Sequence, residues 1–291
     1  MSFSDRPASV IRVGIGGWAF PPWRGGFYPA GLPQARELEF ASRRFSAIEI
    51  NSTFHRTQKP ESFRRWAAET PDDFVFTLKG PRFVVSRPRL EAAGPGIARF
   101  LESGITELGA KLGPILWQLA PTRPFDETEI AAFLDLLPRE VEGRQISHAI
   151  EVRHGSFVDP RFVALARRFN TPIVSADSPD YPAIADLTGS FVYARLRRSA
   201  EAEPTGYPAA ELQQWAKRAR VWAEGGSPAD LAVVGTGDES GAGKLEPPRP
   251  RPVFIFFIDG AKVRAPAAAQ AFVQQLVTGD VEAAIADDAE Q

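Results

Sequence analysis

Eight short apolar runs recur along the chain, each with the composition typical of a buried strand. They are rich in Val, Ile and Phe, which favour strands, and Gly, Pro, Asn or Asp often bounds them. A continuous apolar run is typical of parallel strands that are covered on both faces. The runs lie at residues 10–17, 45–51, 73–79, 114–120, 146–153, 171–177, 190–196 and 252–258.

Helical patterns separate most of these runs. In four segments the apolar residues recur at three- and four-residue spacing, which places them on one face of a helix. Asp126 precedes one of these segments and Glu129 follows three residues later, a spacing that predicts an N-cap and resembles a capping box. The four segments cover residues 34–45, 60–71, 126–138 and 211–224.

Alternation of strands and helices predicts parallel strands joined by right-handed crossovers. Eight such units favour a single (β/α)8 TIM-type barrel with a core over about residues 11–275. The stretch GIGGWAF lacks the glycine spacing of a dinucleotide-binding turn, which disfavours an open doubly wound sheet. Too few residues separate the sixth and seventh runs for more than one helical turn. Residues 225–252 are rich in Gly and Pro and predict a long mobile loop before the eighth strand.

Composition excludes several functional classes. The 291 residues carry a formal net charge of -2, so nucleic-acid binding would need a local basic patch rather than a basic surface. There is no Cys, which excludes disulfides and thiolate metal sites. No apolar run approaches the length of a membrane span, and the N-terminus lacks the pattern of a signal peptide. We therefore expect a cytoplasmic protein.

Polar residues end nearly all of the predicted strands. Residues two apart on a strand share a face, and barrel chemistry occurs where the strands end. A fold selected for stability alone would place apolar residues there, because buried unpaired charges are costly. The candidate inward-facing set comprises Trp18, Glu49, Asn51, Thr53, Thr77, Lys79, Gln118, Glu151, Arg153, Ser175, Asp177, Tyr193, Arg195 and Asp259.

The charges in this set nearly balance, and that limits the chemistry. A divalent-metal cage needs carboxylates or imidazoles free of internal cations, and the chain has three His. We therefore predict no dedicated metal site and no cofactor, although one Mg²⁺ or Mn²⁺ held by two carboxylates stays compatible. Lys79, Arg153 and Arg195, together with Asn51 and Gln118, instead suit an oxyanion such as phosphate or carboxylate.

Other candidates have two interpretations each. Trp18 and Trp23 could form a stacking wall for a sugar or base, or pack over the barrel mouth. Glu49 and Glu151 are candidate acid/base groups, although Glu49 also suits an ion pair with a neighbouring cation. His154 is a third acid/base candidate, and it equally suits the start of the fifth helix. His55 suits either the rim or the exposed surface, and Arg197 and Arg198 suit either a solvated loop or an extension of the anion-binding rim.

Six motifs in fixed order resemble the YecE-like family, a domain of unknown function with the catalogue number 72. They are GIGGWAFPPWRGGFYP (14–29), IEINSTFH (48–55), WAAETPDDFVFTLK (66–79), LGPILWQLAP (112–121), AIEVRHGSF (149–157) and FVYARL (191–196). The resemblance spans about residues 11–275 and implies a (β/α)8 barrel without an established reaction. It implicates Trp18, Trp23, Glu49, Asn51, Thr53, Lys79, Gln118, Glu151, Arg153, His154, Tyr193 and Arg195. The chain departs from the family pattern at His55, at Arg197–Arg198 and at Ile258–Asp259.

Three functions fit these observations. The first is an enzyme, such as a hydrolase or lyase, that acts on a phosphorylated or nucleotide-like substrate, with Glu49 or Glu151 as general base. The second is a metal-assisted hydrolase or isomerase that uses Glu49, Glu151, Asp177 and His154. The third is a non-catalytic binding or adaptor protein with residues 225–252 as the partner surface. The expected ligand is a small anion or a nucleic acid.

Overall fold

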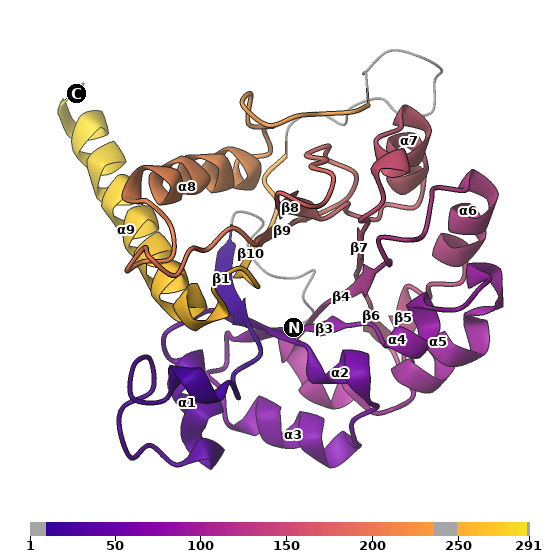
Figure 1. Ribbon diagram of the computed structural model, residues 1–291, viewed down its shortest axis with the longest axis horizontal. Coiled ribbons are helices and arrows are strands. Elements are labelled where there is room, and N and C mark those ends of the chain that lie inside the picture. Colours follow the sequence, from indigo (N-terminus) through magenta and orange to yellow (C-terminus); the bar gives the residue numbers. More distant parts are fainter. Residues whose placement is uncertain (1–9, 236–248, 290–291) are drawn as a thin grey trace.

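Eight parallel strands form a nearly closed barrel in the computed structural model, which describes residues 10–235 and 249–289 (Figure 1). The sheet order is β7-β4-β3-β2-β1-β10-β9-β8, and each of these neighbouring pairs is parallel. Each strand falls within, or within two residues of, a predicted apolar run, which confirms the predicted fold class. The strands are β1 (Ile11–Gly16), β2 (Ala47–Ile50), β3 (Val75–Lys79), β4 (Leu112–Gln118), β7 (His148–Glu151), β8 (Ser175–Asp177), β9 (Val192–Leu196) and β10 (Val253–Phe257).

The ring closes between β7 and β8 through a minimal contact. A single bridge pairs Ile150 with Ile173. It consists of two hydrogen bonds, from the Ile150 amide to the Pro172 carbonyl at 3.0 Å and from the Val174 amide to the Ile150 carbonyl at 2.9 Å. The other seven neighbouring pairs form longer ladders, so this seam is the weakest point of the barrel backbone.

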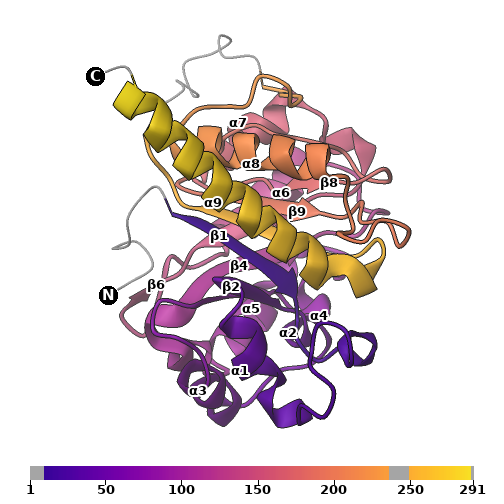
Figure 2. The same cartoon turned by 90° about the vertical axis from the view of Figure 1, so that its left-hand side faces the viewer.

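Helices surround the ring on its outside, and α8 and α9 lie against β1 and β10 (Figures 1 and 2). A short antiparallel hairpin, β5 (Glu140–Val141) with β6 (Arg144–Gln145), precedes β7. The α-helices are α1 (Glu37–Ser42), α2 (Ser52–His55), α3 (Pro60–Ala68), α4 (Arg82–Val85), α5 (Gly94–Leu101), α6 (Glu127–Asp135), α7 (Pro160–Arg168), α8 (Ala209–Ala223) and α9 (Ala265–Ala289). The 3-10 helices are η2 (Pro21–Trp23), η3 (Gln34–Arg36), η4 (Leu90–Ala92), η5 (Ile105–Lys111), η6 (Gly155–Phe157) and η7 (Lys262–Arg264).

Two predicted irregularities can be compared with the structure. No helix occurs between β8 and β9, as the short spacing predicted. The described flanks of the predicted loop, residues 225–235 and 249–252, contain no helix or strand, while its centre at 236–248 lies outside the described residues. The first flank is anchored, because the Asp186 carboxylate accepts the backbone N–H groups of Val234 and Gly235 at 2.7 and 2.9 Å.

The predicted capping box at the start of α6 forms only in half. The Asp126 carboxylate accepts the Glu129 backbone N–H at 2.8 Å, as an N-cap should. The Glu129 carboxylate does not return this bond, since it accepts the Leu90 backbone N–H and the Arg123 guanidinium, each at 2.9 Å. A tertiary ion pair therefore takes the side chain that the local motif would have used.

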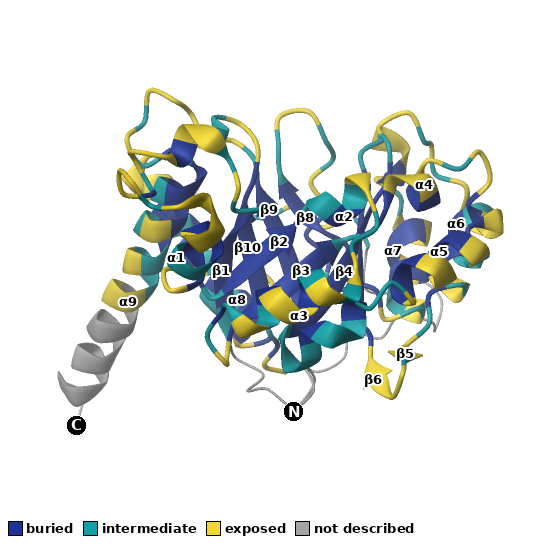
Figure 3. Ribbon diagram, turned by 90° about the horizontal axis from the view of Figure 1, so that it is seen from below, coloured by how far each residue is buried: buried dark blue, intermediate teal, exposed yellow. Residues whose placement is uncertain are grey.

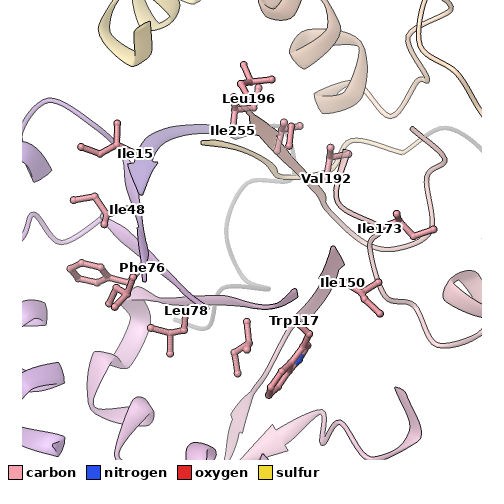
Figure 4. Close-up of a cluster of buried hydrophobic side chains, with 14 of the residues drawn as sticks. Ile15, Ile48, Phe76, Leu78, Trp117, Ile150, Ile173, Val192, Leu196 and Ile255 are labelled. Carbon is pink, nitrogen blue, oxygen red and sulfur yellow. The ribbon is translucent and has the colours of Figure 1, made fainter. Parts of the chain in front are cut away.

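The strands of the barrel are buried along most of their length (Figure 3), and strand alternation divides their side chains into two layers. The outer layer packs between the strands and the helices, and Figure 4 shows Ile48, Phe76, Trp117 and other members of it around the ring. The inner layer fills the barrel with an apolar cluster: Ala47, Val75, Leu116, Ala149, Val174, Phe191, Tyr193, Phe254, Phe256 and Ile258. Gly14 belongs to β1, and a side chain there would place its Cβ 2.0 Å from the Ala47 carbonyl oxygen. The apolar cluster supports the polar residues that follow along the same inward face.

Candidate functional site

Arg195 of β9 is the centre of a buried polar network near the C-terminal ends of the strands. The side chain is 1 % exposed and lies between two glutamates. Its Nε and Nη2 donate to the two oxygens of Glu49 at 3.1 and 3.0 Å, in a two-pronged ion pair. Its Nη1 donates to Glu151 and, at 3.3 Å, to the amide oxygen of Gln118. The guanidinium thus joins β2, β4, β7 and β9.

Glu49 is fully buried, and both of its oxygens are occupied by donors. In addition to Arg195, the Tyr193 hydroxyl donates to Glu49 Oε2 at 2.8 Å. Thr77 Oγ1 lies 2.9 Å from the same tyrosine hydroxyl. Burial, and then the charge of Glu49, raises the pKa of Tyr193 well above its usual value, so the phenol stays a donor. This geometry favours the ion-pair interpretation of Glu49 over the general-base interpretation.

Glu151 of β7 is surrounded by three guanidinium groups. Besides Arg195, Arg153 Nε donates to it at 2.8 Å and Arg197 Nη1 lies 3.6 Å away. Burial alone would raise the pKa of Glu151, and the charges of Arg195, Arg153 and Arg197 outweigh burial and lower the pKa to about 2. The carboxylate is therefore ionised at neutral pH, and Arg153 is further fixed by donating to Gln118 at 2.7 Å.

Tyr181, in the loop between β8 and β9, belongs to the same network and was missed from the sequence. The guanidinium carbons of Arg153 and Arg197 lie 4.3 and 4.9 Å from the centre of its ring. Arg197 Nη2 also pairs with Asp259 at 2.7 Å. The available signal was an aromatic residue in the turn sequence Ser-Pro-Asp-Tyr-Pro, but a loop has no periodicity that assigns a direction to a side chain.

Lys79, the last residue of β3, differs from the three arginines. Its Nζ lies 4.3 Å from the centre of the Phe54 ring, a cation–π contact. No ion pair or hydrogen bond of this ammonium group is found within residues 10–235 and 249–289. Burial first, and the neighbouring charge of Arg195 second, lowers the pKa of Lys79 to about 8. This lysine is therefore a partly buried amine with no carboxylate assigned to it.

A cavity of about 220 Å³ lies above this network. It adjoins an open cleft of about 810 Å³ between β1, α1, α2 and α3, and the two share Gly16, Asn51 and Lys262. The Lys262 ammonium lies 4.7 Å from the centre of the Phe20 ring. The cavity lining is Gly16, Trp23, Asn51, His55, Lys79, Arg195, Phe257, Ile258, Asp259, Lys262 and Ala265. His55, Ile258 and Asp259, three of the positions that depart from the family pattern, lie in this one wall.

The two candidate stacking tryptophans differ in exposure. Trp23 is 1 % exposed, donates its Nε1–H to the Lys262 carbonyl at 2.9 Å and packs edge-on against Phe20. This is the packing interpretation, and it leaves almost no ring surface for a ligand. Trp18 is half-buried in the wall of the cleft and meets Trp66 edge-on, with ring centres 5.2 Å apart. Only Trp18 keeps ring surface towards the cleft.

His154 lies apart from the glutamates with which it was grouped. Its Nδ1 lies 2.8 Å from the Ser156 hydroxyl and accepts the Ser156 backbone N–H at 3.2 Å. These are the contacts of a residue that caps η6, one of the two interpretations of its position. Its contacts therefore do not connect it to Glu49 or Glu151.

The expectation that Ser175 and Asp177 face inward is wrong. Val174 belongs to the inner cluster, and the alternation of β8 therefore points Ser175 and Asp177 outward. Asp177 accepts from the Tyr207 hydroxyl at 3.3 Å and lies 3.8 Å from Arg198, both outside the barrel. Burial raises the pKa of this carboxyl.

The carboxylates of the site do not form a metal cage. Among residues 10–235 and 249–289, no three His, Asp or Glu side chains are grouped so that they could hold a metal ion. Arg195 occupies the space between Glu49 and Glu151, and Asp177 faces the other way. The residue set of the metal-assisted hypothesis therefore does not converge.

Comparisons with known proteins place the chain in a family. The family model described as "Protein of unknown function DUF72" matches residues 12–290, so the chain belongs to the DUF72 family, and the resemblance seen in its motifs is confirmed. The UPF0759 protein YecE of Escherichia coli K12 is 32% identical over 151 residues, which cover 51% of this chain and 50% of that protein. The UPF0759 protein YunF of Bacillus subtilis is 24% identical over 159 residues, covering 53% and 54%. The chain thus spans about half the length of the curated relatives it matches.

Solved structures of the same family share the fold. A DUF72 family protein from Thermotoga maritima superposes with a TM-score of 0.68 at 21% identity, covering 92% of this chain and 99% of that one. A second, from Enterococcus faecalis, gives a TM-score of 0.66 at 16% identity, covering 92% and 95%. Both likenesses concern the fold alone. No helix in the described part of the chain has the length and apolar character needed to span a membrane.

Proposed function

We propose that this protein is an enzyme that binds an anionic substrate, phosphorylated or nucleotide-like, in the cavity and cleft at the C-terminal rim of the barrel. One observation carries the proposal. Lys79 and Lys262 both line the cavity, both hold their ammonium groups over aromatic rings, and neither has an ion-pair partner among the described residues. Two cations without partners in one wall are a binding surface for an anion.

The charge balance of the cavity supports an anionic ligand. Lys79, Lys262 and Arg195 line it, whereas Asp259 is the single carboxylate among its described lining residues. Asp259 is already paired with Arg197. The adjoining cleft adds Arg56 and Arg65, and its one described carboxylate, Glu69, lies 3.7 Å from Arg65. A phosphate there would meet an excess of positive charge.

Neutral recognition groups are also available. Asn51 lines both the cavity and the cleft, and its side chain has no hydrogen-bond partner within the described ranges. Trp18 supplies ring surface beside it, which supports a substrate with a sugar or base next to its anionic group. Glu49 and Glu151 act on this site by holding Arg195 and Arg153 in place, since donors occupy their oxygens. Lys79 and His55 are the groups placed to exchange protons with a ligand.

Isothermal titration calorimetry with inorganic phosphate, pyrophosphate and a nucleoside diphosphate tests the proposal. We expect the parent to bind at least one of them and Lys262→Ala to bind it roughly tenfold or more weakly, since a charge-assisted hydrogen bond contributes about 1.5–3 kcal/mol. Lys217→Ala removes the same charge from the exposed face of α8 and is the matched control. No binding by the parent, or equal affinities of parent and Lys262→Ala, would contradict the proposal.

The salt dependence of binding separates the two expected kinds of ligand. Affinity for a nucleic acid falls steeply with added salt, because many counterions are released. A small phosphorylated substrate releases few, and its affinity falls gently. We expect the gentle dependence, since the cationic wall is confined to a cavity of about 220 Å³ and the cleft beside it.

A further inference from the structure

The surroundings of the Lys79 amine suit a nucleophile as well as a cation that binds an anion. Lys79 ends β3 in the wall of the 220 Å³ cavity. The Phe54 ring covers one side of its amine at 4.3 Å, and no carboxylate holds it in the described part of the chain. Lysine amines become nucleophiles where they are desolvated or next to another cation, and Arg195 lines the same cavity. Nothing in the proposed anion binding requires a desolvated amine at this depth.

We propose that Lys79 forms an imine with the carbonyl carbon of a phosphorylated aldehyde or ketone. This inference rests on the proposed function, because it uses the same cavity and assigns the phosphate to Lys262 and the cations of the cleft. Lys262 lies in the wall shared by cavity and cleft, so a phosphate there leaves the inner cavity and Lys79 to the carbonyl group.

Imine formation at Lys79 needs no reactant besides the carbonyl compound. The lone pair of the neutral Lys79 amine forms a C–N bond to the carbonyl carbon, and the electron pair of the C=O π bond passes to oxygen. The oxygen takes up the proton that the nitrogen loses and gives a carbinolamine. A second proton transfer releases water as the C=N bond forms, with no oxidation or reduction. His55, in the same cavity wall, is the group that we expect to carry these protons.

A neutral amine must be present at working pH for this step. The charged groups that act on Lys79 are Arg195 and Arg153, which disfavour its proton, and Glu49 and Glu151, which favour it. The cavity wall adds His55, Asp259 and Lys262. Burial first, with Arg195 and Arg153, outweighs the two glutamates and lowers the pKa of Lys79 to about 8. About a tenth of the amine is then neutral at pH 7, compared with well under a thousandth for an ordinary lysine of pKa about 10.4.

Reductive trapping tests the inference on the full chain. The protein is incubated with glyceraldehyde 3-phosphate, reduced with sodium cyanoborohydride, digested and mapped by mass spectrometry. We expect the adduct at Lys79 to form at least about tenfold faster than at exposed Lys217, which serves as the control within the same molecule. The rate at Lys79 should rise with pH, reach half of its maximum near pH 8 and level off above about pH 9. Lys262→Ala should slow labelling by glyceraldehyde 3-phosphate much more than it slows labelling by glyceraldehyde, which carries no phosphate.

The possible results separate the two proposals. Equal labelling of Lys79 and Lys217, or none at Lys79, overturns the imine while phosphate binding in the calorimeter still supports the proposed function. Equal rates with glyceraldehyde and its phosphate, together with no phosphate binding, overturn the phosphorylated substrate class and the proposed function. Lys79→Arg, which keeps the charge, should still bind phosphate but give no adduct at position 79, and a circular dichroism spectrum equal to that of the parent establishes that it is folded.

Discussion

Replacing Arg195 by methionine removes the cation that lies between two buried glutamates. Methionine keeps most of the side-chain volume, so the change tests charge rather than packing. Glu49 loses its only ion-pair partner among the described residues and keeps one neutral donor, the Tyr193 hydroxyl. Glu151 keeps Arg153 and Arg197. The two carboxylates are therefore affected unequally.

The expected loss in the free energy of unfolding is about 3–5 kcal/mol at pH 7, the cost of leaving a buried charge without its partner. Since most of the cost arises at Glu49, adding Glu49→Gln to Arg195→Met should restore roughly 2 kcal/mol, because a neutral amide still accepts from Tyr193. Adding Glu151→Gln should restore clearly less, since Glu151 retains two guanidinium partners. This pair of double variants is the matched comparison.

Urea unfolding followed by circular dichroism measures these free energies, and a double-mutant cycle gives the coupling of each pair. Moderate NaCl should leave the losses unchanged, because Arg195 is 1 % exposed and solvent ions do not reach it. A loss below about 1 kcal/mol for Arg195→Met, or equal restoration by the two glutamine substitutions, would refute the reasoning, since a buried charge without a partner should cost more.

Three further predictions concern protons and metal ions. Folding lowers the pKa of Glu151 from 4.5 to about 2, so the ionised carboxylate stabilises the fold above pH 4.5. About 3 kcal/mol of this stability should be lost as the pH falls from 4.5 through 2. Glu151→Gln should therefore show a shallower acid-unfolding profile, and equal profiles would contradict the argument. Lys79→Met should be more stable than the parent by ~1–3 kcal/mol at pH 7, because the pKa of Lys79 falls from 10.5 to about 8 on folding. This difference in stability should disappear as the pH rises from 8 to 10.5. Equal stabilities at pH 7 in urea unfolding would count against the burial of the charge. Millimolar Mg²⁺ or Mn²⁺ should leave the thermal midpoint unchanged, because Arg195 fills the space between Glu49 and Glu151; a rise of several degrees would indicate a metal site.

The strands could be predicted because buried parallel strands appear in the sequence as continuous apolar runs. Which face of β8 points into the barrel could not be predicted. Ile173 on one face and Val174 and Ala176 on the other are all apolar, so the pattern does not distinguish the inner face from the outer one. Placing Asp177 in the site was the consequence of this ambiguity.

Residue types at the rim could also be predicted, whereas their pairing could not. The sequence placed Glu49, Lys79 and Arg195 at one end of the barrel. It did not determine that Arg195 forms ion pairs with both glutamates, so that Lys79 has none among the described residues. The partner of a long side chain depends on how the side chains pack across the barrel. Tyr181, which lies against Arg153 and Arg197, belongs to a loop without periodicity and was missed for that reason.

The bridge between β7 and β8 has a consequence for how the barrel resists unfolding. Two hydrogen bonds join the main chains at this seam, and the ion pairs of Glu151 with Arg195 and Arg197 reach across β8 to β9 above it. These buried ion pairs therefore hold the two sides of the seam together where only two backbone hydrogen bonds join them. Because these ion pairs are buried, added salt should not weaken them, whereas protonation of Glu151 in acid should break them. The barrel would then open first between Ile150 and Val174, and hydrogen exchange at these two amides would report the opening.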